Sequence, residues 1–311
     1  MYFNKIKLLI IQILSVGLIF KLQHLVSFIK IRKLYAVKYT EFMDSASELG
    51  LNFYPVGTYD WELWRRDVKD SFSKNLPIYF LHTEHIGNTM VFGSRHQQKV
   101  KVTLIESCFD EKYVAKLLRE SFLGLPVISD LKYVTSANTI HQAFHLCSYY
   151  NKTGKNLIDS QRIVEWGGGY GCLARIIKKI NPNCTYVIMD LPELSALQYV
   201  YLSSIFGESG VNFITNGFKL EEGKINLISS DYFMSLNEEI KADTFISNWA
   251  LTESGQDYQN YVVENRFFSA DNMLVACIED ENNYIINNSN CSFEHTESIA
   301  VLGDKNVYLI K

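Results

Sequence analysis

A glycine-rich turn at residues 167–171 constrains the fold of this chain more than any other feature. From residue 163 the sequence reads Ile-Val-Glu-Trp-Gly-Gly-Gly-Tyr-Gly-Cys-Leu-Ala: an apolar strand ending in a carboxylate, a turn, and the start of a helix. Because glycine has no Cβ and tolerates a positive φ, such a turn lets a ligand approach the backbone closely. The helix that follows points free N–H groups at the same place. We therefore predict that the chain binds a nucleotide-like cofactor.

Segments with strand and helix character alternate from residue 160 to the end of the chain. This alternation predicts the α/β class, with a doubly wound, seven-stranded Rossmann-like sheet that carries helices on both faces. The predicted strands are Arg162–Glu165, Thr185–Asp190, Ile225–Ser229, Asp243–Asn248, Met273–Glu279 and a terminal pair near Cys291–Glu294 and Asn306–Ile310, while Val211–Thr215 is ambiguous. The predicted helices between them are Cys172–Ile180, Leu194–Phe206 and Tyr258–Phe268.

The sequence that precedes this alternation has a different character. We expect residues 1–135 to form a mainly helical region that caps the site and helps to select the acceptor, and residues 136–311 to form the cofactor-binding domain. Tyr59–Asp70 and Asp110–Phe122 have apolar residues at helical spacing. Lys99–Glu106 alternates in polarity and predicts a strand.

Residues 1–30 are predicted to form a hydrophobic helix whose location stays open. The uncharged stretch Leu8–Phe20 has 13 residues, fewer than the ~20 that a membrane-spanning helix needs. The helix can pack on the rest of the protein or on a second subunit, lie on a membrane surface, or act as an anchor. In the second case the lipid headgroups would contact Lys21, Lys30, Arg32 and Lys33.

Charge and cysteine usage limit the partners. The net charge of −4 gives no overall attraction to nucleic acid, so none is expected as a partner. The six cysteines include no Cys-x-x-Cys pair, which predicts reduced, buried thiols and a cytoplasmic protein, with membrane association through residues 1–30 left open. His82-Thr-Glu-His85 lacks a helix context and a clear third ligand, so no metal site is predicted.

Two carboxylates at strand ends help to choose between two cofactors. Ligands of an open parallel sheet lie beyond the carboxyl ends of its strands, where Glu165 and Asp190 end the first two. Asp190 follows the last glycine by 19 residues, which suits hydrogen bonds to ribose hydroxyls. Gly169-x-Gly171-x-x-Ala174 also fits a dinucleotide. However, the Glu165 carboxylate would attract the amino group of S-adenosylmethionine and repel a pyrophosphate, so we expect S-adenosylmethionine.

Later motifs resemble a known group of enzymes. Asp190-Leu-Pro-Glu193 resembles the Asp-Leu-Pro segment of O-methyltransferases related to the plant phenolic and bacterial polyketide enzymes. Ser230-Asp231-Tyr-Phe233 resembles their Gly-Asp-Met-Phe, and Ala242–Trp249 resembles their fourth strand. Leu197-Gln-Tyr-x-Tyr-Leu and Ser247-Asn-Trp-Ala-Leu-Thr-Glu253 resemble more closely the bacterial sugar O-methyltransferases of surface-polysaccharide clusters. The resemblance covers about residues 160–280. It implies a class I, S-adenosylmethionine-dependent enzyme that methylates a hydroxyl of a sugar in surface polysaccharide or its precursor.

The predicted cofactor-binding residues lie on the glycine turn and at the strand ends that follow it. The resemblance implies that Asp231 lies beside the adenine. Tyr170, Leu191 and Tyr232 are candidates to pack on the adenine or ribose. The complete predicted set is Glu165, Gly167, Gly168, Gly169, Tyr170, Gly171, Asp190, Leu191, Asp231, Tyr232 and Asn248.

The catalytic base is predicted by elimination. The plant-type enzymes carry His-Asp just after the fourth strand, where this chain has Thr252-Glu253. The missing histidine argues against a phenolic acceptor and makes Glu253 the first candidate for a base or for a carboxylate that orients a hydroxyl. His141 and His145 are the other candidates, because residues four apart share one face of a helix.

Three alternatives stay open at this stage. The first is an NAD(P)-dependent oxidoreductase on the same fold. The second is a domain without activity that acts as a scaffold through its N-terminal segment. The third is a methyltransferase that acts on an amine or another small molecule. A small-molecule or glycan acceptor is expected, and a homo-oligomer is left open.

Overall fold

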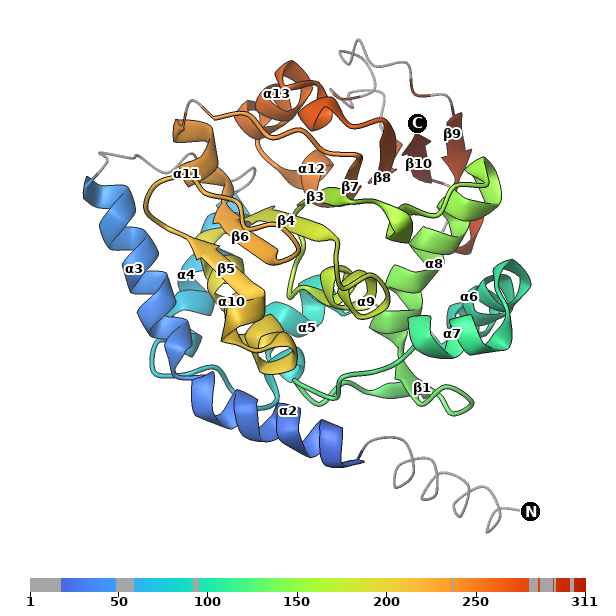
Figure 1. Ribbon diagram of the computed structural model, residues 1–311, viewed down its shortest axis with the longest axis horizontal. Coiled ribbons are helices and arrows are strands. Elements are labelled where there is room, and N and C mark those ends of the chain that lie inside the picture. The colour runs from blue at the N-terminus through green and yellow to red at the C-terminus, as the bar shows by residue number, and fades with distance from the viewer. Residues whose placement is uncertain are drawn as a thin grey trace.

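The computed structural model describes residues 18–48, 59–91, 95–236, 238–279, 285, 293, 295–302 and 305–311. In this part of the chain an eight-stranded sheet has the order β5-β6-β4-β3-β7-β8-β10-β9 (Figure 1). The strands are β3 (Arg162–Trp166), β4 (Thr185–Asp190), β5 (Val211–Ile214), β6 (Ile225–Ser229), β7 (Thr244–Asn248), β8 (Asn272–Ile278), β9 (His295–Ser298) and β10 (Asn306–Ile310). A separate ribbon pairs β1 (Ile128–Asp130) with β2 (Thr135–Ser136).

The pairing of the strands defines a doubly wound sheet. Neighbours from β5 to β8 are parallel, and β10 is antiparallel to both β8 and β9. The order of the strands reverses between β3 and β7, which places the ligand crevice of such a sheet at their carboxyl ends. The predicted α/β class is confirmed, and β5, ambiguous in the sequence, adds one strand to the seven predicted. Most of Cys291–Glu294 lies outside the described residues, and β9 begins at His295.

Helices cover both faces of the sheet. Figure 1 shows α9 and α10 on one face and α11, α12 and α13 on the other. Helices α2 and α3 pack on α10, and one continuous hydrophobic core joins them to the sheet. The helices are α2 (Leu18–Ile31), α3 (Leu34–Glu48), α4 (Tyr59–Phe72), α5 (Glu84–Met90), α6 (Arg95–Cys108), α7 (Glu111–Leu117), α8 (Ala137–Thr153), α9 (Cys172–Ile180), α10 (Pro192–Phe206), α11 (Ser230–Ser235), α12 (Ala250–Glu253) and α13 (Gln256–Glu264).

The N-terminal region is helical, but one of its elements was predicted wrongly. Lys99–Glu106 is not a strand and lies inside α6. Gln98, Lys101, Val102 and Ile105 are buried, and their spacing of three and four residues is that of one helix face. Within the part of the chain that the structure describes, no helix is both long and apolar enough to cross a membrane.

Two cysteines also differ from the prediction. Cys108 in α6 and Cys147 in α8 form a disulfide, with their Cα atoms 6.4 Å apart. Cys172 and Cys184 are free and buried, as expected, and Cys277 is buried as well. The bonded pair is separated by 39 residues and carries no local motif. Only the packing of α6 against α8 brings the two thiols together.

A buried ion pair fastens α9 to the segments before the sheet. Arg175 of α9 is wholly buried and lies 3.5 Å from the Glu120 carboxylate. Its guanidinium donates to Thr139 Oγ1 (2.7 Å) and to the carbonyl oxygen of Arg119 (2.5 Å). Glu120 also accepts from Thr139 Oγ1 (2.7 Å) and from the N–H of Ser136 (2.9 Å). Although burial opposes the charge, Arg175 and these donors lower the pKa of Glu120.

Replacing Arg175 with Met should lower the free energy of unfolding by about 3–5 kcal/mol, because the Glu120 carboxylate would remain buried without its counter-charge. Urea titration followed by circular dichroism near neutral pH measures this change. Since the pKa of Glu120 is lowered by folding, the contribution of the pair is complete above the unfolded-chain pKa of about 4.3. It is lost as the pH falls through the lower pKa of the folded state.

The matched control is Arg162→Met. Arg162 pairs with Glu222 at the surface, with 31% and 69% of the two side chains exposed. An exposed pair contributes about 0–1 kcal/mol. Equal losses of stability in the two variants would contradict the role of the buried pair.

Candidate functional site

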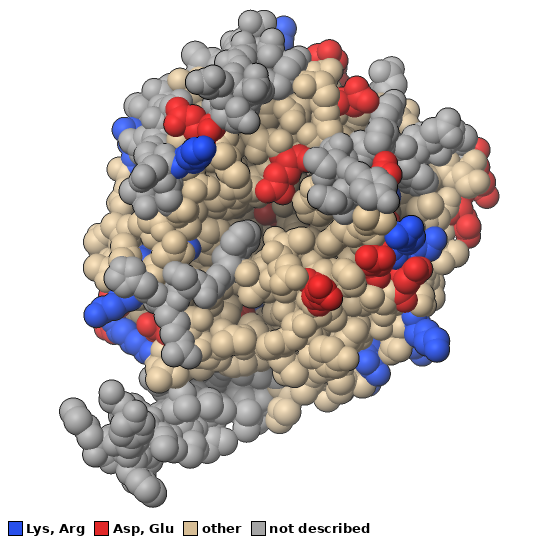
Figure 2. All heavy atoms as spheres, turned by 180° about the vertical axis from the view of Figure 1, so that it is seen from behind, with Lys and Arg blue, Asp and Glu red and all other residues tan. Residues whose placement is uncertain are grey.

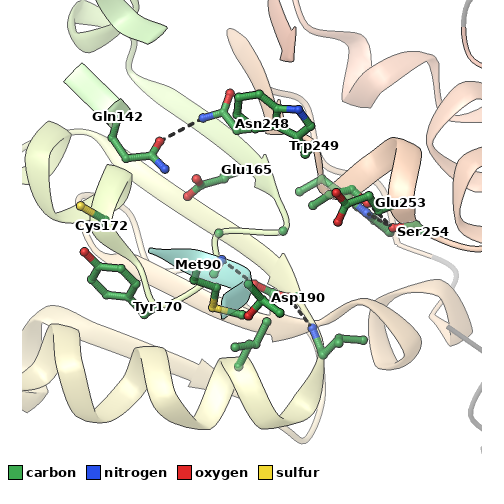
Figure 3. Close-up of a pocket in the computed structure, with 18 of the residues that line it drawn as sticks. Met90, Gln142, Glu165, Tyr170, Cys172, Asp190, Asn248, Trp249, Glu253 and Ser254 are labelled. Carbon is green, nitrogen blue, oxygen red and sulfur yellow. Dashed lines mark hydrogen bonds between the residues drawn. The ribbon is translucent and has the colours of Figure 1, made fainter. Parts of the chain in front are cut away.

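A cavity of about 620 Å³ lies at the carboxyl ends of β3, β4 and β7. The glycine turn, the starts of α10 and α12, and helices α4, α5 and α8 contribute to its wall (Figure 3). The face of the molecule turned away from the viewer in Figure 1 is hollowed near its centre, and acidic side chains lie around this hollow (Figure 2). The cavity therefore occupies the crevice that the reversal of strand order creates.

The glycine turn forms the floor of the cavity. Gly167, Gly169 and Gly171 have φ values of 76°, 57° and 90°, a region that other residues rarely adopt. A Cβ at Gly167 would lie 1.9 Å from the Cβ of Ala250, so the turn after β3 touches the turn after β7. Gly167 to Tyr170 line the cavity, whereas Gly171 is the N-cap of α9.

Glu165 is a buried carboxylate directly beside this turn. It is 3% exposed, lines the cavity and accepts a hydrogen bond from the Tyr186 hydroxyl at 2.9 Å. Burial raises the pKa of Glu165 to about 8, despite the opposing hydrogen bond from Tyr186. A cation bound in the cavity would supply the counter-charge that this carboxylate needs in order to ionise.

Asp190 connects the turn to β4 and α10. Its Oδ2 accepts from the N–H of Gly169 (3.0 Å) and from Gln198 Nε2 (2.7 Å), and its Oδ1 accepts from the N–H of Leu191 (2.8 Å). Gln198 also donates to the carbonyl of Gly169 (2.8 Å). Burial raises the pKa of Asp190 to about 7. Both Asp190 and Leu191 line the cavity, and their contact with a ribose stays a prediction.

The N-terminal helices close the cavity from the side opposite the sheet. A Cβ at Gly169 would lie 3.5 Å from Met90 Sδ, which places the end of α5 over the glycine turn (Figure 3). Trp61 of α4 and Gln97 of α6 also line the cavity. The region predicted as a cap thus contributes directly to the wall.

Carboxamides are concentrated on the α8 side of the cavity. Asn138 Nδ2 donates to the Tyr170 hydroxyl (2.8 Å), and Asn248 Nδ2 donates to Gln142 Oε1 (3.0 Å). All four residues line the cavity. Among the described residues, Asn138 Oδ1 and Asn248 Oδ1 are buried and accept no hydrogen bond. The two hydrogen bonds therefore hold these polar side chains in place along this part of the wall.

The two predicted histidines belong to a buried chain of hydrogen bonds. His141 lines the cavity, but its Nδ1 hydrogen bonds with Lys101 (2.8 Å) and its Nε2 with His145 (3.2 Å). His145 does not line the cavity, and its Nδ1 hydrogen bonds with the Tyr308 hydroxyl (2.5 Å). Burial lowers the pKa of His141 well below its usual range and that of His145 to about 3. This arrangement argues against either histidine as the base.

Trp249 links this chain to the strand ends. It has a φ of 66°, and its ring stacks on His141 with centroids 5.4 Å apart. A bulky residue in the left-handed region is strained and persists only where packing holds it. Its backbone N–H donates to the carbonyl of Ala276 in β8 (2.7 Å). The strained turn therefore fixes the part of the wall between Asn248 and α12.

Glu253 lies at the rim of the cavity, at the end of α12 (Figure 3). Its side chain is exposed at the rim, yet the surrounding wall desolvates the carboxylate and raises its pKa. Its neighbour Ser254 accepts a hydrogen bond from Trp166 Nε1 at 3.2 Å. Both ring nitrogens of His141 and of His145 already take part in hydrogen bonds. Of the three predicted catalytic residues, Glu253 is therefore the one that lines the cavity with a group able to accept a proton.

Asp231 and Tyr232 are not part of the lining, although the adjacent Ser230 is. Asp231 is buried and accepts from the Tyr258 hydroxyl at 2.5 Å. The ring of Tyr232 packs edge-on against Phe42 of α3, with centroids 6.2 Å apart. The structure therefore places both residues in the protein interior beside the site.

Several lining residues were absent from the prediction. Asn138 and Gln142 could have been found, because with His141 they share one face of α8 at spacings of three and four. Met90 and Trp61 belong to elements without a motif, so only the tertiary fold identifies them. The same holds for Asn306 at the start of β10.

No protein-family model and no curated protein matches the chain. Solved structures resemble part of it. PigF with SAH aligns over 52% of this chain and 59% of its own, at 13% identity and a TM-score of 0.36, so the chain spans less than two thirds of PigF. Human N-acetylserotonin methyltransferase with SAM aligns over 78% and 73%, at 14% identity and a TM-score of 0.36. An O-methyltransferase family protein from Burkholderia thailandensis aligns over 56% and 59%, at 12% identity and a TM-score of 0.33.

Replacing Gly167 with Ala should disturb the floor of the cavity. An alanine at this position has to adopt a positive φ, which costs about 1–2 kcal/mol. Its Cβ would also overlap Ala250. Overpacking of this kind adds about 1–3 kcal/mol. Urea titration measures the total loss in the free energy of unfolding.

Gly154→Ala separates the two effects. Gly154 has a φ of 70°, but nothing lies within 4 Å of its added Cβ. This variant should show only the backbone cost. Equal destabilisation of the two variants would contradict the contact between the two turns.

Proposed function

We propose that the protein is an S-adenosylmethionine-dependent O-methyltransferase. The observation that carries this proposal is the pair of buried carboxylates on either side of the glycine turn. Glu165 suits the cationic amino group of the cofactor, and Asp190 suits its ribose hydroxyls. The residues present therefore fit this cofactor.

The same features disfavour a nicotinamide dinucleotide. The pyrophosphate of a dinucleotide lies against the glycine turn and the N-terminus of the following helix. Glu165 lies so near that a Cβ on Gly168 would be 3.0 Å from its Oε2. A pyrophosphate beside this turn would raise the pKa of Glu165 further, and its charge would disfavour binding where the carboxylate is ionised.

The acceptor side of the cavity supports a polyhydroxylated substrate. Besides the cofactor residues, the wall contains carboxamides that can both donate and accept hydrogen bonds, and indole rings that can cover the apolar face of a sugar. These residues are Asn88, Gln97, Asn138, Gln142, Asn306, Trp61 and Trp249. Together with the sequence resemblance, they favour a sugar of surface polysaccharide or its precursor over a phenol. We propose that residues 1–135 act as the cap that selects it.

The roles of the residues follow from their positions. When bound, the cofactor supplies a methyl carbon on a sulfonium, which an acceptor oxygen attacks in line with the departing sulfur. Glu165 and Asp190 hold the ligand at the strand ends, and Met90 covers the glycine turn and limits access of water. Glu253 takes the proton of the acceptor hydroxyl, and its raised pKa makes it a better base than an ordinary surface glutamate.

Binding of S-adenosylmethionine should strengthen as the pH rises toward 8. Because burial holds the pKa of Glu165 near 8, the carboxylate is mostly protonated below that value and must lose its proton to pair with a cation. The change is at most about tenfold per pH unit. Isothermal titration calorimetry over this pH range measures it.

Glu165→Gln is the decisive variant in the same experiment. Loss of a hydrogen bond to a charged group should weaken binding by about tenfold to a hundredfold. The part of the pH dependence centred near 8 should disappear. NAD is the control ligand for wild type. Unchanged binding in the variant, or binding of NAD alone, would overturn the cofactor assignment.

Replacing Glu253 with Gln should reduce kcat by about 10²–10⁴-fold if the residue is the base. The affinity for S-adenosylmethionine should stay unchanged, because Glu253 lies at the rim and not at the glycine turn. Turnover on a panel of sugars with radiolabelled cofactor measures kcat. Glu264→Gln, an exposed glutamate on α13, is the matched control. Equal turnover in the two variants would refute the role of Glu253.

A further inference from the structure

Helix α2 carries apolar side chains on two opposite faces. Its inner face buries Phe28 and Ile31 where α2 packs on α10. Its outer face exposes Leu22, Val26 and Ile29, with 50%, 50% and 48% of their surface accessible. Spacings of four and three place these residues in one stripe. A helix on a protein surface usually has a polar outer face, so the stripe indicates a partner.

Cationic side chains border this outer stripe. Lys30 and Lys33 are exposed beside Ile29. The first 40 residues contain seven Lys and Arg and no Asp or Glu, whereas the whole chain has a net charge of −4. The positive charge is therefore concentrated at one end of the chain. Such an asymmetry is typical of segments that bind an anionic surface.

We propose that the outer stripe of α2 docks the protein on an anionic lipid surface. Leu22, Val26 and Ile29 enter the boundary between headgroups and acyl chains, and the neighbouring lysines bind the headgroup phosphates. The preceding sequence agrees with this partner, because Leu8–Phe20 contains no charged residue. A second copy of the chain fits less well, since two such stripes would bring their cations together. The proposal is independent of the proposed methyl transfer.

Flotation of the full-length protein with vesicles tests this proposal. The protein should float with vesicles of phosphatidylcholine and phosphatidylglycerol, but much less with phosphatidylcholine alone. Added salt should weaken the binding, because it screens the headgroup charge. The combined variant Leu22→Ser, Val26→Ser and Ile29→Ser should bind the vesicles at least about tenfold more weakly, since it removes the inserted apolar surface.

The combined variant Val127→Ser and Leu131→Ser is the matched control. These residues are 66% and 61% exposed, outside α2, and the variant should float like wild type. Thermal unfolding should be unchanged in both variants, because all five side chains are exposed. Two results would overturn the proposal: a wild type that does not float with anionic vesicles, or a serine variant of α2 that floats equally well. Light scattering that shows a lipid-free dimer, dissolved by the α2 variant, would assign the stripe to a second copy instead.

Discussion

The position of the glycine turn depends on the buried ion pair of Arg175 and Glu120. Arg175 lies one turn into α9, directly after the glycines, and its guanidinium reaches both Thr139 of α8 and the carbonyl of Arg119. A wholly buried charge tolerates little displacement, because each lost partner leaves a polar group desolvated. The pair therefore fixes α9 relative to α8, and α8 carries the carboxamides that line the cavity. An ion pair outside the cavity thus helps to hold the glycine turn in register with the carboxamides of α8.

Positive φ angles shape two of the turns at these strand ends. The turn after β3 uses glycines with positive φ, and the turn after β7 places Trp249 at a φ of 66°. These two turns touch, since the backbone of Gly167 leaves no room for a Cβ beside Ala250. Strain at non-glycine residues is found where packing and function require a particular side-chain direction. Here it directs an indole ring onto His141 at the cavity wall.

The sequence allowed the sheet and two carboxylates of the cavity wall to be predicted. Strands β3 and β4 are short apolar runs with a carboxylate at or next to their last residue, so periodicity located Glu165 and Asp190 without an atomic structure. The roles of His141 and His145 could not be predicted. Their shared face was correct, but the partners that occupy their nitrogens, Lys101 and Tyr308, are remote in sequence.

Other differences have the same origin. The first six residues of Lys99–Glu106 alternate in polarity, yet the segment also has the three- and four-residue spacing of α6, and tertiary packing decided between the two. Cys108 and Cys147 meet only because α6 packs on α8. Asp231 lies next to a lining residue, but the Tyr258 hydroxyl holds it in the interior. Short-range patterns therefore specified elements, while contacts between remote segments specified which side chains reach the cavity.

The wall of the cavity is assembled from residues between Trp61 and Asn306. No short fragment of the chain contains it, so the capacity to bind a ligand appears only when most of the polypeptide has folded. A ligand that binds only the folded form adds RT ln(1 + [L]/Kd) to its stability, or about 2.7 kcal/mol at a hundredfold excess over Kd. Occupancy of the cavity thus reinforces the sheet, the N-terminal helices and the last strand together, and it couples the lifetime of the folded protein to the supply of whatever ligand binds there.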